Sequence, residues 1–377
     1  MLQSPEFRRD VARQLDAAAA RVPNLTAFVG LDGFVDEILH VVDKRHDASR
    51  YDRVATIAAY AQRLAAAAGR STNVELVNVM TKLGGNGPIM ANALASFGLQ
   101  VRYLGALGYP ALHPVFEPFA RRAEVSSLCG PGLTDALEFE DGKIMVGKHY
   151  TLKEVNWPNL CERYGREKVA AQLGSCHLVG FVNWTMLPFM SDIWEAIETE
   201  ILPQLPPPGA TRQKIFFDLA DPEKRLAEDI RRALDLIVRF GSRFDVILGL
   251  NEKEAYEIAR VLGLDNRPRD PEGLAQLALE IQRQVPVGTL VVHPVAYALA
   301  VSQGAAAIVE GPVCPRPKIT TGAGDHFNSG FCLGQLLGFD PAASVLCGVA
   351  TSGHYVRTAT SPSVADLSAL LRNWPQA

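Results

Sequence analysis

Short apolar runs alternate along most of the chain with longer segments of helical periodicity. The apolar runs are Ala27–Leu31, Val101–Leu107, His177–Val182, Ile215–Leu219, Val246–Leu250 and Leu290–Val292. The segments with apolar residues at helical spacing are Tyr51–Ala68, Pro88–Phe97, Phe189–Leu202, Pro222–Phe240, Glu252–Leu262 and Pro271–Gln284. Continuous apolar strands separated by helices predict a mostly parallel sheet that helices cover on both faces. From Ala323 onward the pattern predicts helices with little strand between them.

One segment departs from this pattern. Residues Ala136–Val146 alternate between apolar and polar side chains around a central Asp141-Gly142. An Asp-Gly pair between alternating runs is a strong signal for a β-hairpin. We expect this hairpin and the stretch Val35–Val42 to form a small second sheet, as a lid or a dimer-forming arm; an ordinary edge hairpin is the alternative. The predicted organisation is one α/β domain over residues 1–377, with the lid formed by insertions near 34–44 and 134–150.

Composition and charge exclude several classes of protein. Of 377 residues, 48% are hydrophobic and 21% are charged, which is typical of a globular chain and not of a disordered one. The 37 Lys and Arg against 41 Asp and Glu give a net charge of −4, so we expect neither a nucleic acid nor a membrane as partner. Charges throughout Glu6–Asp16 leave no room for a secretory signal, and no run of 18 apolar residues is present. The six cysteines lack CxxC or zinc-ligand spacing, which predicts reduced thiols in a cytoplasmic protein.

The segment Ile319–Phe331 carries the strongest chemical signal. Its sequence, Ile-Thr-Thr-Gly-Ala-Gly-Asp-His-Phe-Asn-Ser-Gly-Phe, passes from small residues directly into an apolar helix. Gly322, Ala323 and Gly324 let backbone N–H groups converge at the helix N-terminus, which favours a bound anion. Asp325 falls in the first turn, where the helix dipole favours an ionised carboxylate that can take a proton from a hydroxyl. The structural alternative is a glycine turn in which Asp325 only caps the helix.

This segment resembles the C-terminal signature of the ribokinase-like (PfkB-type) carbohydrate kinases. It matches the family pattern D-T-T-G-A-G-D-x-F-x-x-G-F at every position except the first. Other landmarks follow in the family's order: Gly30–Asp36, the Gly-Gly motif Gly84–Gly98 followed by the strand Val101–Gly108, and Asn251–Glu254 as Asn-x-x-Glu. The resemblance therefore extends from Gly30 to Phe331 and covers most of the chain.

The resemblance implies a ribokinase-like three-layer α/β sandwich, with a central, mostly parallel sheet flanked by helices and a small β-sheet lid. It also implies ATP-dependent transfer of a phosphoryl group, with Mg²⁺, to a hydroxyl of a sugar or sugar derivative. Asp325 would act as general base, and the backbone of Thr321–Gly324 would form the anion hole. The nucleotide-binding residues implied in the same way are Asn251, Thr321, His293 and Asn328. Asn251 and Glu254 would hold Mg²⁺ through water; the alternative for this pair is an N-cap with a capping box.

Short polar residues in the N-terminal half would contact the sugar. The candidates implied by the resemblance are Asp32, Asp36, Gly85, Asn86 and Asn183. Carboxylates suit vicinal hydroxyls because each oxygen accepts two hydrogen bonds, and a glycine lets the sugar approach the backbone. Turn chemistry is the alternative for Asp32, and Trp184, next to Asn183, is as readily placed in the core as against a sugar.

Some positions depart from the family. Ile89 stands where the Gly-Gly motif usually has Asn, and Asn86 would replace that sugar contact. Ile319 stands where many members have an Asp that helps bind an activating monovalent cation, so potassium use stays open. The nucleotide strand ends in His293-Pro294 instead of Thr-x-Gly, which would weaken ATP binding. Tyr355 falls in the region where the family packs adenine, and core packing is expected for it.

Two other functions stay open at this stage. The departures at Ile89, Ile319 and His293 would suit a non-catalytic sensor of a sugar or nucleotide with the same fold, although such a sensor needs no intact Gly-Ala-Gly-Asp. A nucleoside could also replace the sugar as acceptor. A homodimer joined through the lid is an expectation from the resemblance. The sequence does not say which sugar, or which of its hydroxyls, is phosphorylated.

Overall fold

A nine-stranded sheet forms the centre of the computed structural model, which describes residues 4–209 and 212–375. The strand order is β14-β13-β12-β11-β10-β9-β1-β5-β6. The strands are β1 (Thr26–Leu31), β5 (Gln100–Gly105), β6 (Glu124–Ser127), β9 (Leu178–Phe181), β10 (Lys214–Asp218), β11 (Asp245–Leu250), β12 (Thr289–Val292), β13 (Tyr297–Ser302) and β14 (Ala305–Glu310). Pairing is parallel from β6 to β12 and antiparallel between β12, β13 and β14. The predicted mostly parallel sheet is confirmed, while β6, β13 and β14 were not expected.

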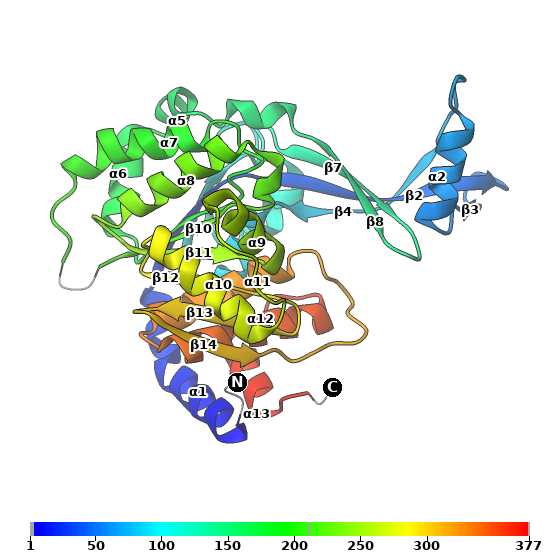
Figure 1. Ribbon diagram of the computed structural model, residues 1–377. Coiled ribbons are helices and arrows are strands. Elements are labelled where there is room, and N and C mark those ends of the chain that lie inside the picture. The colour runs from blue at the N-terminus through cyan, green and yellow to red at the C-terminus, as the bar shows by residue number, and fades with distance from the viewer. Residues whose placement is uncertain (1–3, 210–211, 376–377) are drawn as a thin grey trace.

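Helices cover both faces of this sheet, as Figure 1 shows. One face packs against α5 (Trp157–Arg163), α6 (Arg166–Ser175), α7 (Met190–Ala196), α8 (Ala227–Phe240), α9 (Glu252–Leu262) and α10 (Pro271–Gln284). The other packs against α1 (Pro5–Ala18), α3 (Asn86–Phe97), α4 (Glu117–Ala120), α11 (Ala323–Leu336), α12 (Pro341–Thr358) and α13 (Val364–Arg372). Strand β10 supplies both layers, because Ile215 and Phe217 face one core and Phe216 the other. The predicted three-layer α/β class is confirmed.

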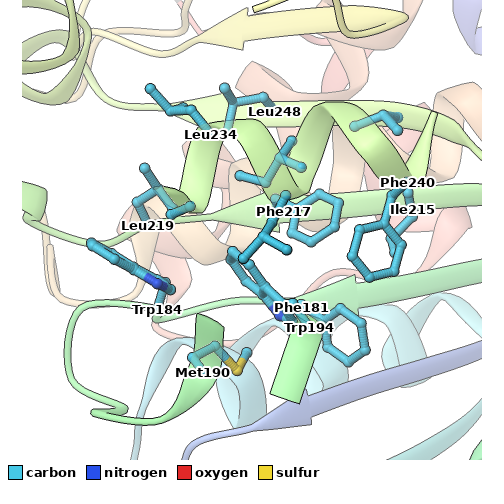
Figure 2. Close-up of a cluster of buried hydrophobic side chains, with 14 of the residues drawn as sticks. Phe181, Trp184, Met190, Trp194, Ile215, Phe217, Leu219, Leu234, Phe240 and Leu248 are labelled. Atoms are coloured by element: carbon cyan, nitrogen blue, oxygen red, sulfur yellow. The ribbon is translucent and has the colours of Figure 1, made fainter. Parts of the chain in front are cut away.

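Aromatic side chains fill the layer between β9–β11 and the helices α7 and α8 (Figure 2). Trp194 meets Phe217 edge to face with ring centroids 4.9 Å apart, and Phe240 lies 5.4 Å from Phe217. Such pairs contribute about 0.5–1.5 kcal/mol each beyond the area they bury. Trp184 is fully buried in the same cluster, with its indole N–H donated to Ser191 Oγ at 2.8 Å. It therefore belongs to the core and not to the sugar site.

A second, five-stranded sheet projects from the first as an arm (Figure 1). Its members are β2 (Phe34–Arg45), β3 (Tyr51–Arg53), β4 (Leu76–Gly84), β7 (Gly132–Glu138) and β8 (Lys143–Lys148), with α2 (Ile57–Ala66) packed on it. Strands β7 and β8 form the predicted hairpin, with Glu138 paired to Lys143 across the turn. The prediction of one continuous helix from Tyr51 was wrong, because Tyr51–Arg53 pairs with the end of β2 and the helix begins at Ile57. Strand β4, the partner of β2, was not expected.

Two predicted helices end or begin elsewhere than expected. The first is α7, which ends at Ala196 and continues as the π-helical turn η4 (Ile197–Ile201) and the 3₁₀ turn η5 (Leu202–Gln204). The stretch from Pro222 opens with the 3₁₀ turn η6 (Pro222–Lys224) before α8. The remaining 3₁₀ segments are η1 (Ala19–Asn24), η2 (Pro114–Phe116) and η3 (Tyr150–Glu154). Over residues 4–209 and 212–375, no helix combines the length and apolar character needed to cross a bilayer.

The strand order reverses between β1 and β9. From β1 the sheet grows through β5 to β6 on one side, and through β9, β10, β11 and β12 on the other. In open parallel sheets, ligands bind at the carboxyl ends of the strands beside such a switch point. This edge of the sheet is therefore where a functional site is expected, and the residues that follow β1, β9, β10, β11 and β12 converge on it.

Candidate active site

A cavity of about 440 Å³ lies at this edge, between the two sheets and the N-terminus of α11. The main sheet contributes residues that end or follow its strands: Asn183, Asp218, Ala220, Asp221, Asn251 and His293. The second sheet and its connections contribute Phe34, Asp36, Thr134, Met145, Gly147 and His149. The helix starts contribute Gly85, Asn86, Ile89, Thr321, Gly322, Gly324 and Asp325. Of the predicted site residues, Asp32, Ala323 and Asn328 do not line the cavity.

Asp325 lies in the first turn of α11, with Gly322 as the residue before the helix. Its side chain is buried, and Oδ1 accepts a hydrogen bond from Asn86 Nδ2 at 2.9 Å. Burial raises the pKa of Asp325 to about 8, while the bond from Asn86 opposes this rise and the nearby Asp32 carboxylate adds to it. The sequence-based expectation of an ionised carboxylate is therefore corrected for the ligand-free chain, because desolvation raises the pKa of Asp325 above its ordinary value.

The turn before α11 needs its glycines. Gly322 has φ 91°, and a Cβ there would lie 3.2 Å from Ile89. A Cβ on Gly324 would lie 3.1 Å from the His293 ring, so a larger residue would displace one of these neighbours. The Ala323 N–H bonds back to the Thr320 carbonyl at 3.1 Å and closes the turn. The N–H groups of Gly322 and Gly324, both at the cavity, are therefore the better candidates for contact with an anion.

Asp36 is the carboxylate of β2 that faces the cavity. Burial raises its pKa, and this rise is opposed first by the charge of Lys82 and then by a hydrogen bond with Thr134. Lys82 and Thr134 are its cross-strand neighbours on β4 and β7. A Cβ on Gly84 would lie 2.5 Å from the Asp36 carboxylate, so the Gly-Gly motif makes room for it. This arrangement presents a carboxylate to a polyhydroxy ligand.

Asp32 lies behind the cavity wall. It is fully buried, and its Oδ1 accepts from the Gly87 N–H at 2.9 Å and from the Tyr103 hydroxyl at 3.2 Å. Its Oδ2 accepts from Asn183 Nδ2 at 2.7 Å. Burial raises the pKa of Asp32 to about 6, with these hydrogen bonds opposing the rise. Asp32 thus anchors the start of α3 and the Asn183 side chain, which lines the cavity.

Asn183 has an unused acceptor. Its φ is 60°, a left-handed conformation that asparagine tolerates better than most residues. Its Oδ1 is buried and has no hydrogen-bond partner among residues 4–209 and 212–375. A buried unpaired amide oxygen is costly, so its position beside the cavity is suited to a ligand hydroxyl.

Two buried acids, Asp218 at the end of β10 and Glu254 in the first turn of α9, lie near enough to interact. Glu254 accepts from the Asn251 N–H at 2.8 Å and from the Asp221 N–H at 2.9 Å, while Asn251 Oδ1 accepts from the Glu254 N–H. The capping-box alternative for Asn251 and Glu254 is therefore present in the structure. Burial, and next the Asp218 carboxylate, raise the pKa of Glu254 to about 8. A carboxylate whose pKa is raised by a neighbouring carboxylate favours a proton or a nearby cation.

Asp218 was missed as a site residue by the sequence analysis. Its Oδ1 accepts from the Ala220 N–H and its Oδ2 from Asn328 Nδ2, both at 2.9 Å. Burial and the nearby Asp325 carboxylate raise its pKa to about 7. The available signal was its place as the polar end of an apolar strand at the carboxyl edge. Asn328 acts from the interior, through Asp218, because it is buried and does not line the cavity.

His293 follows β12 and lines the cavity as expected. Its ring packs against Phe327 with centroids 4.8 Å apart. Burial lowers the pKa of His293 to about 4, so the ring is neutral at physiological pH and can donate or accept one hydrogen bond at each nitrogen. Other lining residues carried no sequence signal because they come from turns and insertions: Phe34, Thr134, Met145, His149, Met186 and Lys224.

The chain is similar to one protein family over nearly its whole length. The profile of the prokaryotic ketohexokinase family matches residues 5–374. The ketohexokinase of Haloferax volcanii is 29% identical over 351 residues, which are 93% of this chain and 91% of that protein.

Among solved structures, a carbohydrate kinase from Agrobacterium tumefaciens superposes with a TM-score of 0.62 at 19% identity, covering 93% of this chain and 98% of that one. The ribokinase of Arabidopsis thaliana, solved with ribose and ATP, gives 0.61 at 15% identity over 92% and 98% of the two chains. These structures share the fold, and the ribokinase-like resemblance inferred from the motifs is confirmed.

Proposed function

The chain belongs to the prokaryotic ketohexokinase family, and on that premise we propose that it transfers the γ-phosphoryl group of ATP to a hydroxyl of a ketohexose. Family membership makes the chain a sugar kinase, a phosphotransferase with an alcohol acceptor that uses ATP. This family membership excludes the alternative that the chain is a non-catalytic sensor of a sugar or nucleotide. The observation that carries the residue-level proposal is the hydrogen bond from Asn86 to Asp325, which brings the two glycine motifs together at one cavity.

Asp325 is the proposed general base. Its carboxylate would accept the proton of the sugar hydroxyl as that oxygen attacks the γ-phosphorus. A base works best when its pKa lies near the working pH, and burial brings Asp325 to about 8. Asn86 Nδ2 would hold the Asp325 carboxylate in place by donating to its Oδ1, which leaves the other lone pairs of that carboxylate for the substrate.

The turn Thr321–Gly324 is the proposed anion hole. Free N–H groups at a helix N-terminus favour the negative charge of a transferring phosphoryl group. Ala323 contributes to the shape of the turn, since its own N–H bonds to Thr320. The donors proposed for the phosphoryl oxygens are therefore Gly322 and Gly324.

The sugar would lie between the two sheets. Asp36 and Asn183 present oxygen acceptors to its hydroxyls, and Gly85 and Asn86 form the wall beside Asp325. In this proposal Asp32 acts by holding Asn183 and the start of α3, because its oxygens are already hydrogen-bonded and lie outside the cavity.

ATP would lie along the carboxyl ends of β11 and β12, near Asn251, His293 and Thr321, with Asn328 acting through Asp218. Mg²⁺ fits the donor chemistry there, because the Asp218 carboxylate raises the pKa of Glu254 and a divalent cation would offset the charge that these acids place at one site. Mg²⁺ keeps much of its hydration shell, so we propose that Asn251 and Glu254 act through water. When bound, Mg²⁺ neutralises charge on the phosphate oxygens.

Potassium does not fit this chain in the way the resemblance implies. Ile319 offers an alkyl group where the monovalent cation would need a carboxylate oxygen. Potassium therefore has no role in the proposed reaction.

The single-domain organisation, with a lid near residues 34–44 and 134–150, and a homodimer through that lid are also proposals. Met80 and Met145, on strands β4 and β8, are each about half exposed on the second sheet, which supports burial by a second copy. Sedimentation should give twice the chain mass for wild type and a single chain mass for Met80→Glu with Met145→Glu. A cytoplasmic location is proposed because the cysteines within the described ranges are free thiols.

The direct test is ADP release from ATP and Mg²⁺ with a panel of ketohexoses, aldohexoses, sugar acids and nucleosides. Asp325→Asn should lower kcat on the best acceptor by about 10²–10⁴-fold while calorimetry shows retained sugar binding. Asp229→Asn is the matched control, because Asp229 is also in the first turn of a helix, α8. Wild-type turnover by Asp325→Asn would overturn the base assignment, and turnover on nucleosides alone would overturn the proposed acceptor.

A further inference from the structure

Two aromatic side chains hold the turn that precedes α11: Tyr355 from α12, and His326 from the first turns of α11 itself. The Tyr355 hydroxyl donates to the Thr321 carbonyl at 3.0 Å. His326 Nδ1 lies 2.7 Å from the Gly322 carbonyl. The two rings stack with centroids 3.6 Å apart and an interplanar angle of 13°. Consecutive carbonyls of the turn are thus each tied to one member of a stacked pair.

The hydrogen-bond pattern defines the state of His326. A backbone carbonyl only accepts, so Nδ1 must carry the proton. Nε2 then accepts from the Ser361 hydroxyl at 2.9 Å, and Ser361 Oγ can in turn accept from Asn92 Nδ2 at 3.4 Å. A neutral ring agrees with the burial that lowers the pKa of His326 to about 4. The pair is therefore anchored to α3 as well as to α12.

Holding a carbonyl also orients the next amide. In a planar trans peptide, the C=O of one residue and the N–H of the next point in opposite directions. The bond from Tyr355 to the Thr321 carbonyl therefore directs the Gly322 N–H away from Tyr355. Ile89 also lies against Gly322, but its side chain has no polar atom that could hold the Thr321 carbonyl. Glycine at φ 91° has little intrinsic preference for this orientation, so the restraint must come from outside.

We propose that Tyr355 is a positioning residue for phosphoryl transfer, which holds the Gly322 N–H toward the transferring group, and that His326 supports it by stacking and by holding the next carbonyl. This rests on the proposed anion hole and deepens it. The expected role differs from core packing, which the sequence analysis assigned to Tyr355, because the hydroxyl and not only the ring is required. Removing one donor from such a hole typically costs about 10²–10³-fold in kcat. Releasing a donor to rotate should cost less, about tenfold.

Tyr355→Phe tests this directly, because it keeps the ring stack and removes the hydroxyl. We expect kcat to fall about tenfold, with the KM for the sugar within about twofold of wild type. The complex of ADP, Mg²⁺, sugar and aluminium fluoride, which imitates the transferring group, should weaken by the same factor as kcat. Tyr256→Phe is the matched control. Tyr256, on α9, is as buried as Tyr355, and its hydroxyl also donates to a backbone carbonyl, that of Pro268, at 2.9 Å.

Both tyrosine variants should lose similar thermal stability, and only Tyr355→Phe should lose kcat. A kcat for Tyr355→Phe within about threefold of wild type, or an equal loss in Tyr256→Phe, would overturn the proposal. Adding His326→Phe to Tyr355→Phe should cost less than the product of the single effects, because both hold one turn. If the loss of kcat in the double variant equals the product of the two single losses, the proposal is also overturned. Asp325→Asn, run in parallel, separates failures: if it loses activity while Tyr355→Phe does not, only the positioning role fails.

Discussion

Asn86 Nδ2 donates to Asp325 Oδ1 across 2.9 Å, although 239 positions separate the two residues in the chain. Asn86 begins α3 and Asp325 lies in the first turn of α11, and these helices pack side by side. The bond ties the Gly-Gly motif to the Gly-Ala-Gly-Asp motif. It also stabilises the ionised form of the Asp325 carboxylate and so opposes the rise in pKa that burial causes.

Asn86→Ala should therefore shift the pH profile of catalysis. Without this donor the pKa of Asp325 rises further above 8, so less of the base is ionised at pH 7. Each unit of upward shift should lower kcat at pH 7 about tenfold and allow partial recovery at pH 9. The measurement is kcat against pH for both proteins; an equal loss at every pH would contradict this explanation.

Asp325 should also make the ligand-free protein less stable as pH rises. Its folded pKa of about 8 exceeds its ordinary value of 3.8, so between these values the unfolded carboxyl is ionised while the folded one keeps its proton. Stability from this group is present below pH 3.8 and is lost as pH rises toward 8. Asparagine does not titrate. Asp325→Asn should thus melt above wild type, by more at pH 8 than at pH 6 in a thermal scan. A gap independent of pH would count against the raised pKa.

Asp36→Asn should weaken sugar binding. A hydrogen bond to a charged group contributes about 1.5–3 kcal/mol, so the sugar KM should rise about 10- to 100-fold with the KM for ATP unchanged. Glu37→Gln is the control, because neighbouring residues of β2 face opposite sides of the sheet and the Glu37 carboxylate accepts a hydrogen bond from Asn78 Nδ2 at 3.0 Å. Equal effects of the two substitutions would show that Asp36 makes no special contact.

Activity should not depend on potassium. The Ile319 side chain supplies no ligand oxygen for a cation. Replacing KCl by choline chloride at constant ionic strength keeps charge screening the same, so kcat should stay within about twofold of its value in KCl. Titration with potassium, at saturating ATP, Mg²⁺ and sugar, makes the comparison. A saturable increase in kcat would mean that other groups of the chain hold the cation.

Gly330→Ala should destabilise the fold without touching the site. Gly330 lies where α11 crosses α12, and a Cβ there would lie 2.2 Å from Thr351 Oγ1 and 2.6 Å from the Cys347 carbonyl. Overpacking of this kind costs about 1–3 kcal/mol. Denaturant unfolding measures it, with Gly209→Ala as control because a Cβ there meets nothing within 4 Å. A loss in the free energy of unfolding below about 0.5 kcal/mol would mean that α11 and α12 shift apart easily to make room for the methyl group.

The parts of the fold that the sequence predicted well are those with local causes. Apolar strands such as β11 and helices such as α9 and α10 follow from side-chain periodicity and caps, which act within a few residues. The β7–β8 hairpin follows from Asp141-Gly142 in the same way. Strand β4 was missed because its place is decided by pairing with β2, a contact between distant segments.

The same division holds for the site. The motifs of the sequence were enough to predict which residues supply the site's chemical groups: Gly322, Gly324 and Asp325, and the Asn-x-x-Glu at the start of α9. The state of those groups was decided by tertiary structure. Burial, with Asp32 and Glu254 nearby, raises the pKa of Asp325; hydrogen bonds from three segments place Asp32 behind the cavity; and the stacking of Tyr355 on His326 requires α11 and α12 side by side. Local patterns determine which atoms are available, whereas desolvation and orientation depend on neighbours that only the folded chain brings together.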